Sequence, residues 1–317
     1  MASEPTILVR RGTNHGIETS EYAAKLRDRT DAAVVHASTP DEEFAAIEDA
    51  EIVTGGDLRG DLLDAAANLR LFAGTSAGYD HLPLDEFRTR GVAVTNASGV
   101  HGPNIAEQVM GWILTFGRNL HEGWRREHRP EWRHFQSHEL AGETVAIVGL
   151  GGIGQALVPR LEGFDVTTVG VRYTPAKGGP TDEVYGFDEI HEAVADAAYV
   201  VVACPLSDAT ENLVDGPVFK TMRADSVLVN VGRGPIVDTE ALMDAVRNSR
   251  IRGAALDVTD PEPLPHDHPL WDFENVLVTP HNAGHSPKLF DRLADLLAGN
   301  VERVRESGYA DLENQVV

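Results

Sequence analysis

The feature that most constrains this fold is a short run of glycines that directly follows a strand pattern. Residues 144–148 read TVAIV and lead straight into residues 149–154, which read GLGGIG. A helical pattern then runs through Leu157 and Leu161, and a second strand pattern extends from Val166 to Val171. A strand, a glycine turn, a helix and a second strand in that order form the unit that binds dinucleotides, so the sequence predicts a Rossmann domain.

Three glycines of this turn have separate expected roles. Gly149 permits the tight turn, Gly151 lets the backbone approach a pyrophosphate, and Gly154 lets helix and strand pack closely. The exposed N–H groups of the helix N-terminus then face the anion. An ordinary glycine-rich turn is the alternative interpretation, and the flanking strands and helix argue against it.

The end of the second strand indicates which nucleotide is favoured. An NAD-specific unit places Asp or Glu there to accept a hydrogen bond from the ribose 2′-hydroxyl, whereas this chain has Val171, Arg172, Tyr173 and Thr174. A guanidinium only donates hydrogen bonds, so Arg172 suits a 2′-phosphate. The sequence therefore favours NADP(H), with NAD(H) as the second candidate. Alternatively, Arg172 is a solvated surface residue and the site is unselective.

Three further motifs carry polar residues that suit a reaction on a carboxylate-bearing substrate. The strand pattern Val227 to Val229 continues into NVGRG, which puts Arg233 at a strand end, where open α/β sheets bind ligands. Its guanidinium can hold a carboxylate with two parallel hydrogen bonds. The proline-rich run DPEPLP predicts a rigid loop that carries Glu262, and the strand pattern Val276 to Thr279 delivers His281 to another strand end.

Glu262 and His281 could work as an acid–base pair. An imidazole moves protons near neutral pH, and a carboxylate on its second nitrogen fixes the tautomer. Each residue alone also has a structural interpretation: an ion pair for Arg233, a solvated charge for Glu262 and a strand-end cap for His281. Their joint occurrence after a dinucleotide turn favours the catalytic interpretation.

With the motifs GLGGIG, CPLSDATENLV, NVGRG, DPEPLP and TPH in that order, the chain resembles the D-isomer-specific 2-hydroxyacid dehydrogenases. That family includes D-lactate, glycerate and D-3-phosphoglycerate dehydrogenases and glyoxylate/hydroxypyruvate reductases. The resemblance spans most of the chain. It implies reversible, NAD(P)-dependent reduction of a 2-oxo acid to a D-2-hydroxy acid on two doubly wound α/β domains.

The resemblance also implies roles for individual residues. Arg233, Glu262 and His281 would be the catalytic trio, and the substrate would contact Arg233, His281 and the backbone N–H groups of Ala77 and Gly78. The turn that contains Ala77 and Gly78 precedes a helix start and suits an anion. The expected cofactor contacts are Gly149, Gly151, Gly152, Ile153, Gly154, Arg172, Tyr173, Cys204, Pro205, Thr210, Val231, Gly232, Asp257 and Gly284.

Two positions depart from the family pattern. Arg172 occupies the place of the acid that NAD-dependent members usually have. Gly102, Pro103 and Asn104 replace a more usual polar and small run.

By the family topology, residues 1–98 and 286–317 form a discontinuous, flavodoxin-like substrate domain, and residues 99–285 form the dinucleotide-binding domain. The active site is then expected in the cleft between the two domains. Alternating strand and helix patterns in the first domain support this division. The expected strands are Thr6–Val9, Ala33–Val35, Glu51–Thr54, Leu69–Ala73 and Val92–Thr95. The expected helices are Glu21–Arg27, Asp41–Ala50, Asp61–Ala67 and Leu84–Arg90.

Two longer helices are expected as well. One starts near Asn104 and carries an apolar stripe that runs as far as Leu120. The other, the last helix of the chain, runs from about Pro287 through Val301 and returns to the first domain.

The strongly acidic composition and the absence of long apolar runs indicate which binding partners and which cellular location are expected. The formal net charge is −23, so binding to a nucleic acid or an anionic membrane is not expected. Only four lysines occur, and this scarcity of lysine together with the excess of acidic residues resembles the composition of proteins from salt-accumulating halophiles. An acidic mesophilic protein is the alternative. No apolar run reaches membrane-spanning length and no signal pattern opens the chain, so we expect a soluble, cytoplasmic protein. The one cysteine, Cys204, excludes an internal disulfide and is expected to line the cofactor site.

The aromatic residues Trp124, Trp132 and Phe135 lie among charges in or beside an arm-like stretch from Arg125 to His134. Members of the family use this neighbourhood for a two-fold contact, so a homodimer is expected. The alternative is a helix end that packs on its own domain. Two histidines in the following proline-rich loop, His266 and His268, lack further ligands nearby, and no metal is expected.

Other functions fit the same motifs. A dinucleotide-sensing binding protein, like the corepressor relatives of this family, is the main competitor. Glyoxylate/hydroxypyruvate reductase is the most specific enzyme alternative. Oxidation of formate or phosphite is a third alternative, and formate is disfavoured because members with that activity carry Gln at the position of Glu262. Pocket residues such as Gly55, Gly56 and Tyr79 do not reveal which 2-oxo acid fits.

Overall fold

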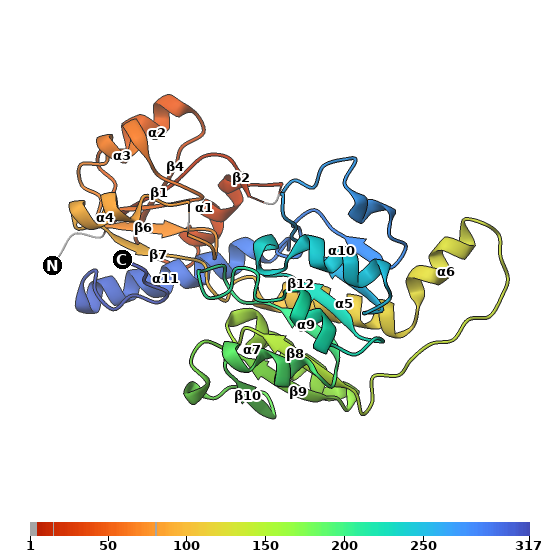
Figure 1. Cartoon of the computed structure of the whole chain (residues 1–317). Coiled ribbons are helices and arrows are strands. Elements are labelled where there is room, and N and C mark those ends of the chain that lie inside the picture. Colours follow the sequence, from red (N-terminus) through yellow and green to blue (C-terminus); the bar gives the residue numbers. More distant parts are fainter. Residues whose placement is uncertain (1–4, 15, 80) are drawn as a thin grey trace. The chain divides into compact units, whose positions relative to one another are not determined.

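The computed structural model describes residues 5–14, 16–79 and 81–317. The chain forms two compact units, each with its own parallel sheet (Figure 1). Unit 1 consists of residues 1–101 and 285–317, and unit 2 consists of residues 102–284.

Unit 1 is built on a five-stranded parallel sheet in the order β4-β1-β5-β6-β7. This order places the first strand between the second and the third, which is the flavodoxin-like arrangement. The strands are β1 (Thr6–Val9), β4 (Ala33–His36), β5 (Ile52–Gly55), β6 (Leu71–Gly74) and β7 (Ala93–Thr95), with a small antiparallel pair β2 (Thr13–Asn14) and β3 (Ile17–Glu18). The helices are α1 (Thr19–Arg27), α2 (Pro40–Ile47), α3 (Gly60–Ala65), α4 (Leu84–Arg90) and α11 (Leu289–Ser307).

The last helix completes the core of unit 1. One face of α11 is apolar at helical spacing, and Leu289, Leu293 and Leu297 are buried there. Its Phe290 stacks on Tyr22 of α1 with the ring centroids 5.3 Å apart. In Figure 1 the blue α11 accordingly lies beside elements from the red and orange start of the chain.

Unit 2 contains a seven-stranded parallel sheet in the order β10-β9-β8-β11-β12-β13-β14. This is the Rossmann order 3-2-1-4-5-6 extended by one strand. The strands are β8 (Thr144–Val148), β9 (Thr167–Val171), β10 (Glu183–Tyr185), β11 (Ala197–Val202), β12 (Val227–Asn230), β13 (Gly253–Leu256) and β14 (Val276–Val278). The α-helices are α5 (Gly102–Gly117), α6 (Leu120–Glu127), α7 (Gly152–Leu161), α8 (Ile190–Val194), α9 (Gly216–Thr221) and α10 (Thr239–Arg247). Short 3-10 turns are η1 (Glu162–Phe164), η2 (Pro175–Lys177), η3 (Phe187–Glu189), η4 (Gly234–Ile236) and η5 (Pro269–Asp272).

Both faces of the unit 2 sheet are covered. Val145 and Ile147 of β8 pack into a cluster with α5 and α7, while Ala146 and Val148 pack into a second cluster with α8, α9 and α10. Because helices cover both faces of the sheet, every residue of β11 is buried. A strand in this position therefore needs apolar residues at every position.

The predicted stripe on the long helix is wrong at its end. Helix α5 stops at Gly117, Asn119 adopts the left-handed region with φ 52°, and Leu120 opens the separate helix α6 with 42% of its surface exposed. The guanidinium of Arg252 donates to the carbonyl of Phe116 and to the side chain of Asn119. These hydrogen bonds satisfy acceptor groups at the end of α5 from a distant part of the chain. The local sequence pattern therefore could not reveal where the helix ends.

No helix within residues 5–14, 16–79 and 81–317 is long and apolar enough to span a membrane.

Candidate active site

The three polar residues singled out in the sequence follow three neighbouring strands of the unit 2 sheet. Asn230 of β12 pairs with Leu256 of β13, which in turn pairs with Val278 of β14. Arg233, Glu262 and His281 come after the carboxyl ends of these strands, and the ends of parallel strands share one edge of a sheet. The geometry therefore gathers all three motifs at the edge where α/β proteins bind ligands.

The turn that carries Arg233 fits tightly between its neighbours. A Cβ on Gly232 would lie 2.8 Å from the carbonyl oxygen of Cys204, and one on Gly234 would lie 2.0 Å from that of Thr259. Only glycine allows this approach, so the turn has little freedom. Arg233 itself is half-buried and donates from Nη1 to the carbonyl of Gly232 at 2.9 Å. Its other N–H groups have no partner among the described residues, which leaves them available for a carboxylate.

Glu262 and His281 are in direct contact. Nδ1 of His281 lies 2.5 Å from Oε1 of Glu262, with the side chains 48% and 39% exposed, respectively. A carboxylate accepts, so Nδ1 donates and Nε2 is left for another partner. His281 also adopts the left-handed region with φ 52°, which is uncommon for a residue with a side chain.

The glycine turn after β8 has the geometry that a pyrophosphate requires. Gly149 has φ 111°, and a Cβ there would lie 2.5 Å from the backbone nitrogen of Cys204. A Cβ on Gly154 would lie 2.4 Å from the carbonyl oxygen of Gly149, so the helix packs closely against the turn. Gly151 faces open space, and no side chain caps the N-terminus of α7, where Gly152 and Ile153 stand. The uncapped N–H groups therefore fit a bound phosphate group.

Arg172 comes directly after β9, next to this turn in the sheet order. Its Nη1 donates to the carbonyl of Gly178 at 2.5 Å, and the side chain is half-buried. The adjacent Tyr173 is 78% exposed and meets Phe187 edge-on. Arg172 is thus anchored within its own loop while most of its N–H groups stay free of partners among the described residues.

The loop after β11 is braced from within. Thr210 is buried, and its hydroxyl donates to the carbonyl of Pro205 at 2.7 Å and accepts from the backbone N–H of Ser207. Cys204 is buried, and burial raises the pKa of its thiol to about 12. A buried thiol in this state is a poor nucleophile, which favours a packing role for Cys204.

The other predicted cofactor residues lie near the same edge. Val231 is buried, and its N–H donates to the carbonyl of Val202 at 3.0 Å. The carboxylate of Asp257 accepts from the backbone of Asn282 and Ala283. Gly284, half-buried, is the last residue of unit 2.

The predicted anion cradle belongs to unit 1. Asn96 donates from Nδ2 to the carbonyl of Ala77 at 2.7 Å, and the N–H of Ala97 donates to the carbonyl of Ser76. These bonds hold the carbonyls, while the N–H groups of Ala77 and Gly78 have no partner among the described residues. Asp80, which follows this segment two residues after Gly78, lies outside the described residues.

Sequence reasoning missed Asn230, whose side chain binds both ends of the Arg233 turn. An asparagine at the end of a buried strand was the available signal. Among the described residues, no three His, Cys, Asp or Glu side chains are grouped so that they could hold a metal ion.

Comparison with known proteins identifies the family. Residues 110–283 match the nucleotide-binding domain of the D-isomer-specific 2-hydroxyacid dehydrogenases. The chain belongs to this family. It is accordingly an NAD(P)-dependent oxidoreductase with a Rossmann domain, as the motifs predict.

Individual members of the D-isomer-specific 2-hydroxyacid dehydrogenases are similar over most of the chain. A glyoxylate reductase of Thermofilum pendens is 35% identical over 252 residues, which cover 76% of this chain and 73% of the relative. The crystal structure of a family member from Aeromonas salmonicida is 28% identical with a TM-score of 0.86, and 99% of each chain is covered. An NADPH-dependent glyoxylate/hydroxypyruvate reductase from Sinorhizobium meliloti, solved with NADP and malonate, is 29% identical with a TM-score of 0.74. The match to it covers 99% of this chain and 97% of that one.

Proposed function

We propose that this enzyme reversibly reduces a small 2-oxo acid to the D-2-hydroxy acid, with glyoxylate and hydroxypyruvate as the first substrates to test. The observation that carries the proposal is the His281–Glu262 pair, 2.5 Å apart, on the strand edge that also bears Arg233. A charged donor for a carboxylate and an oriented imidazole are what reduction of a 2-oxo acid requires from a protein.

Each residue of the trio has a distinct task in this mechanism. Arg233 holds the substrate carboxylate with its unpartnered N–H groups, and the free N–H groups of Ala77 and Gly78 are proposed to bind the same anion. When bound, the nicotinamide supplies the hydride that reaches the carbonyl carbon. His281, protonated and oriented by Glu262, gives a proton from Nε2 to the developing alkoxide.

The cofactor contacts follow the strand ends of unit 2. The glycine turn is proposed to hold the pyrophosphate, and Arg172 the 2′-phosphate of NADPH, which makes NADPH the favoured cofactor. Residues Tyr173, Cys204, Pro205, Thr210, Val231, Gly232, Asp257 and Gly284 are proposed to line the rest of the nucleotide site. Unit 1 is proposed as the substrate domain, and a cytoplasmic location is part of the same proposal.

The direct test follows cofactor oxidation with a panel of 2-oxo acids from glyoxylate to branched compounds. Turnover of at least one member with NADPH supports the enzyme. Tight NADPH binding without turnover of any member would instead identify a dinucleotide sensor on the same scaffold. His281→Ala serves as the matched control, since it removes the proton donor and leaves the nucleotide site intact.

We also propose that the protein is a homodimer formed through an arm, residues 120–138. Arm residues expose large aromatic surface, with Trp124 and Trp132 exposed by 53% and 100%. Exposed aromatic residues of this size are typical of protein interfaces. The long loop that follows α6 is visible in Figure 1 as an excursion of unit 2 before β8.

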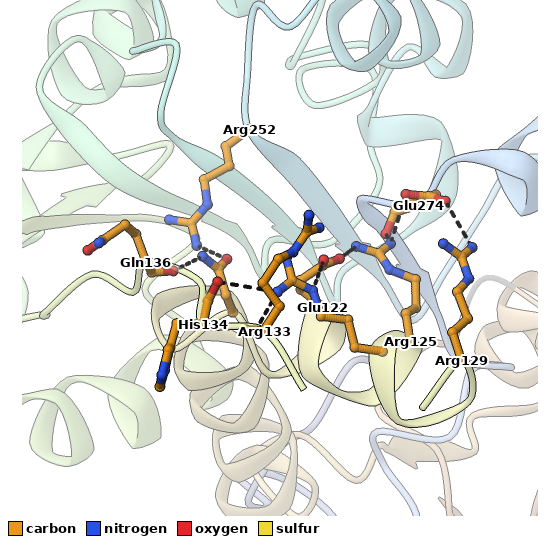
Figure 2. Close-up of polar contacts among 10 residues, drawn as sticks. Glu122, Arg125, Arg129, Arg133, His134, Gln136, Arg252 and Glu274 are labelled. Atoms are coloured by element: carbon orange, nitrogen blue, oxygen red, sulfur yellow. Dashed lines mark hydrogen bonds and ion pairs between the residues drawn. The ribbon is translucent and has the colours of Figure 1, made fainter. Parts of the chain in front are cut away.

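Polar contacts hold this arm in a defined conformation. Glu122 accepts from Arg125 at 2.8 Å and from Arg126 at 2.6 Å, and Arg126 also donates to the carbonyl of Arg133 at 2.6 Å. Figure 2 shows Arg125 and Arg129 directed toward Glu274, each 3.8 Å from one of its oxygens. An ordered arm loses little conformational freedom when a partner binds, which favours association.

Analytical ultracentrifugation tests the dimer. Trp132→Ser should shift the protein toward the monomer, because it removes the most exposed aromatic side chain of the arm. Phe44→Ser, at an aromatic residue 49% exposed in unit 1, is the control and should leave the dimer intact. A monomeric wild-type protein at micromolar concentration would refute the proposal.

A further inference from the structure

Two buried polar residues stand behind the catalytic edge of unit 2. Asn230 ends β12 with 1% of its surface exposed, and Asp257 directly follows β13 with 4% exposed. The N–H of Asp257 donates to the carbonyl of Asn230 at 3.0 Å, so the two are joined through the backbone. Burial of polar groups is unfavourable unless they form hydrogen bonds, so the partners of these side chains indicate their purpose.

Asn230 binds the turn that presents Arg233. Its Nδ2 donates to the carbonyl of Arg233 at 3.0 Å, and its Oδ1 accepts from the N–H of Gly232 at 3.0 Å. One amide thus uses a donor and an acceptor to close the turn around the arginine.

Asp257 binds the loop that presents His281. Its Oδ1 accepts from the hydroxyl of Thr279 at 2.6 Å and from the N–H of Asn282 at 3.0 Å, and its Oδ2 accepts from the N–H of Ala283 at 2.9 Å. Its backbone carbonyl accepts from the N–H of His281 at 2.8 Å. These bonds enclose the one residue of the loop with a left-handed backbone, and such a conformation persists only where its surroundings hold it.

We propose that Asn230 and Asp257 are positioning residues that set the directions of Arg233 and His281. This inference rests on the function proposed above and adds to the cofactor contact proposed for Asp257. Three of about four acceptor sites on its carboxylate already serve the histidine loop, which leaves about one for a ligand. Asn230 acts on substrate binding through Arg233, and Asp257 acts on proton transfer through His281.

Near-isosteric variants separate the two effects. Asp257→Asn turns one oxygen into an NH2 group that cannot accept from the loop backbone, so kcat at saturating NADPH should fall at least about tenfold. Asn230→Asp removes the donor to the carbonyl of Arg233, so KM for the 2-oxo acid should rise at least about tenfold while kcat changes less. Ser226→Ala is the matched control, because Ser226 is fully buried and donates to the carbonyl of Arg223 just before the amino end of β12.

A readout independent of turnover is the tautomer of His281, measured by long-range ¹H–¹⁵N NMR of the neutral ring. The wild type should show the Nδ1–H form, since Nδ1 faces Glu262. Asp257→Asn should shift the ring toward the Nε2–H form, while Asn230→Asp and Ser226→Ala should keep the wild-type form.

These measurements distinguish the possible failures. A tautomer shift in Asp257→Asn with no turnover by the wild type would support positioning and overturn the proposed function. Wild-type kcat and tautomer in Asp257→Asn, with only weaker NADPH binding, would restrict Asp257 to a cofactor contact and overturn the inference for it. An unchanged KM in Asn230→Asp would overturn it for Asn230. Equal loss of activity in Ser226→Ala would show general loosening of the sheet and overturn it for both.

Discussion

Replacement of Arg172 tests directly whether this residue determines the preference for NADPH over NADH. The side chain is half-buried after β9, and its bond to the carbonyl of Gly178 at 2.5 Å holds it within its loop. A hydrogen bond to a charged group contributes about 1.5–3 kcal/mol, which corresponds to a preference of roughly 10-fold to 150-fold for NADPH. Because solvent reaches the side chain, we expect a value near the lower end of that range.

Two substitutions bracket this effect. Arg172→Gln removes the charge and should bring the two cofactors to similar kcat/KM. Arg172→Asp should reverse the order, because a carboxylate accepts from the ribose 2′-hydroxyl and repels the 2′-phosphate.

The assay compares kcat/KM for NADPH and NADH at saturating 2-oxo acid. Both are measured at one ionic strength, since salt screens the contact. Equal efficiency with the two cofactors in the wild type, unaltered in both variants, would show that Arg172 points into solvent and would refute the reasoning.

Three further predictions address the proton donor, the thiol and the surface charge. His281→Ala should lower kcat by about 10² to 10⁴ while NADPH affinity in a fluorescence titration stays nearly unchanged, and near-wild-type turnover would remove His281 from the mechanism. Since the pKa of the Cys204 thiol is raised to about 12, a disulfide reagent at neutral pH should label only unfolded protein, and rapid labelling of the native protein would contradict its burial. With a net charge of −23, the melting temperature should rise from dilute buffer to molar KCl, whereas an unchanged melt would favour a mesophilic protein.

A fourth prediction in the same group concerns the arm. Hydrogen bonds from Arg125 and Arg126 lower the pKa of Glu122 from 4.5 to about 2. Because the pKa of Glu122 is lowered in the folded state, the stability that its contacts give the arm is complete above the unfolded value of 4.5 and is lost as pH falls toward about 2. Dimer content by ultracentrifugation should therefore fall within this acidic range. Glu122→Gln should reduce the dimer at neutral pH, and an unaffected dimer would separate the arm from association.

Elements with local signals could be predicted closely from the sequence. Strand β1 matches its predicted bounds, and so does α4, which ends where Gly91 adopts φ 67°. The glycine turn after β8 was predictable for the same reason, because the strand, the glycines and the helix are consecutive in the chain.

The remaining features depend on contacts between distant residues. The end of α5 is fixed by Arg252, which lies more than a hundred residues further along the chain. The supporting bonds of Asp257 reach residues more than twenty positions away, and no periodic pattern encodes them. The sequence therefore predicts which residues gather at a strand edge, whereas their hydrogen-bond partners emerge only from the fold.

The way the chain passes between its two units affects how such a protein can be recombined. Unit 2 is one uninterrupted segment that carries Arg233, Glu262 and His281, whereas unit 1 is interrupted by it. Two crossovers can therefore exchange the whole of unit 2 with its trio intact. A unit 1 from another member must be transferred as two separate segments whose helices α1 and α11 still pack together, because Tyr22 in the first segment stacks on Phe290 in the second. Chimeras of this family should accordingly tolerate a transplanted unit 2 better than a transplanted N-terminal piece of unit 1.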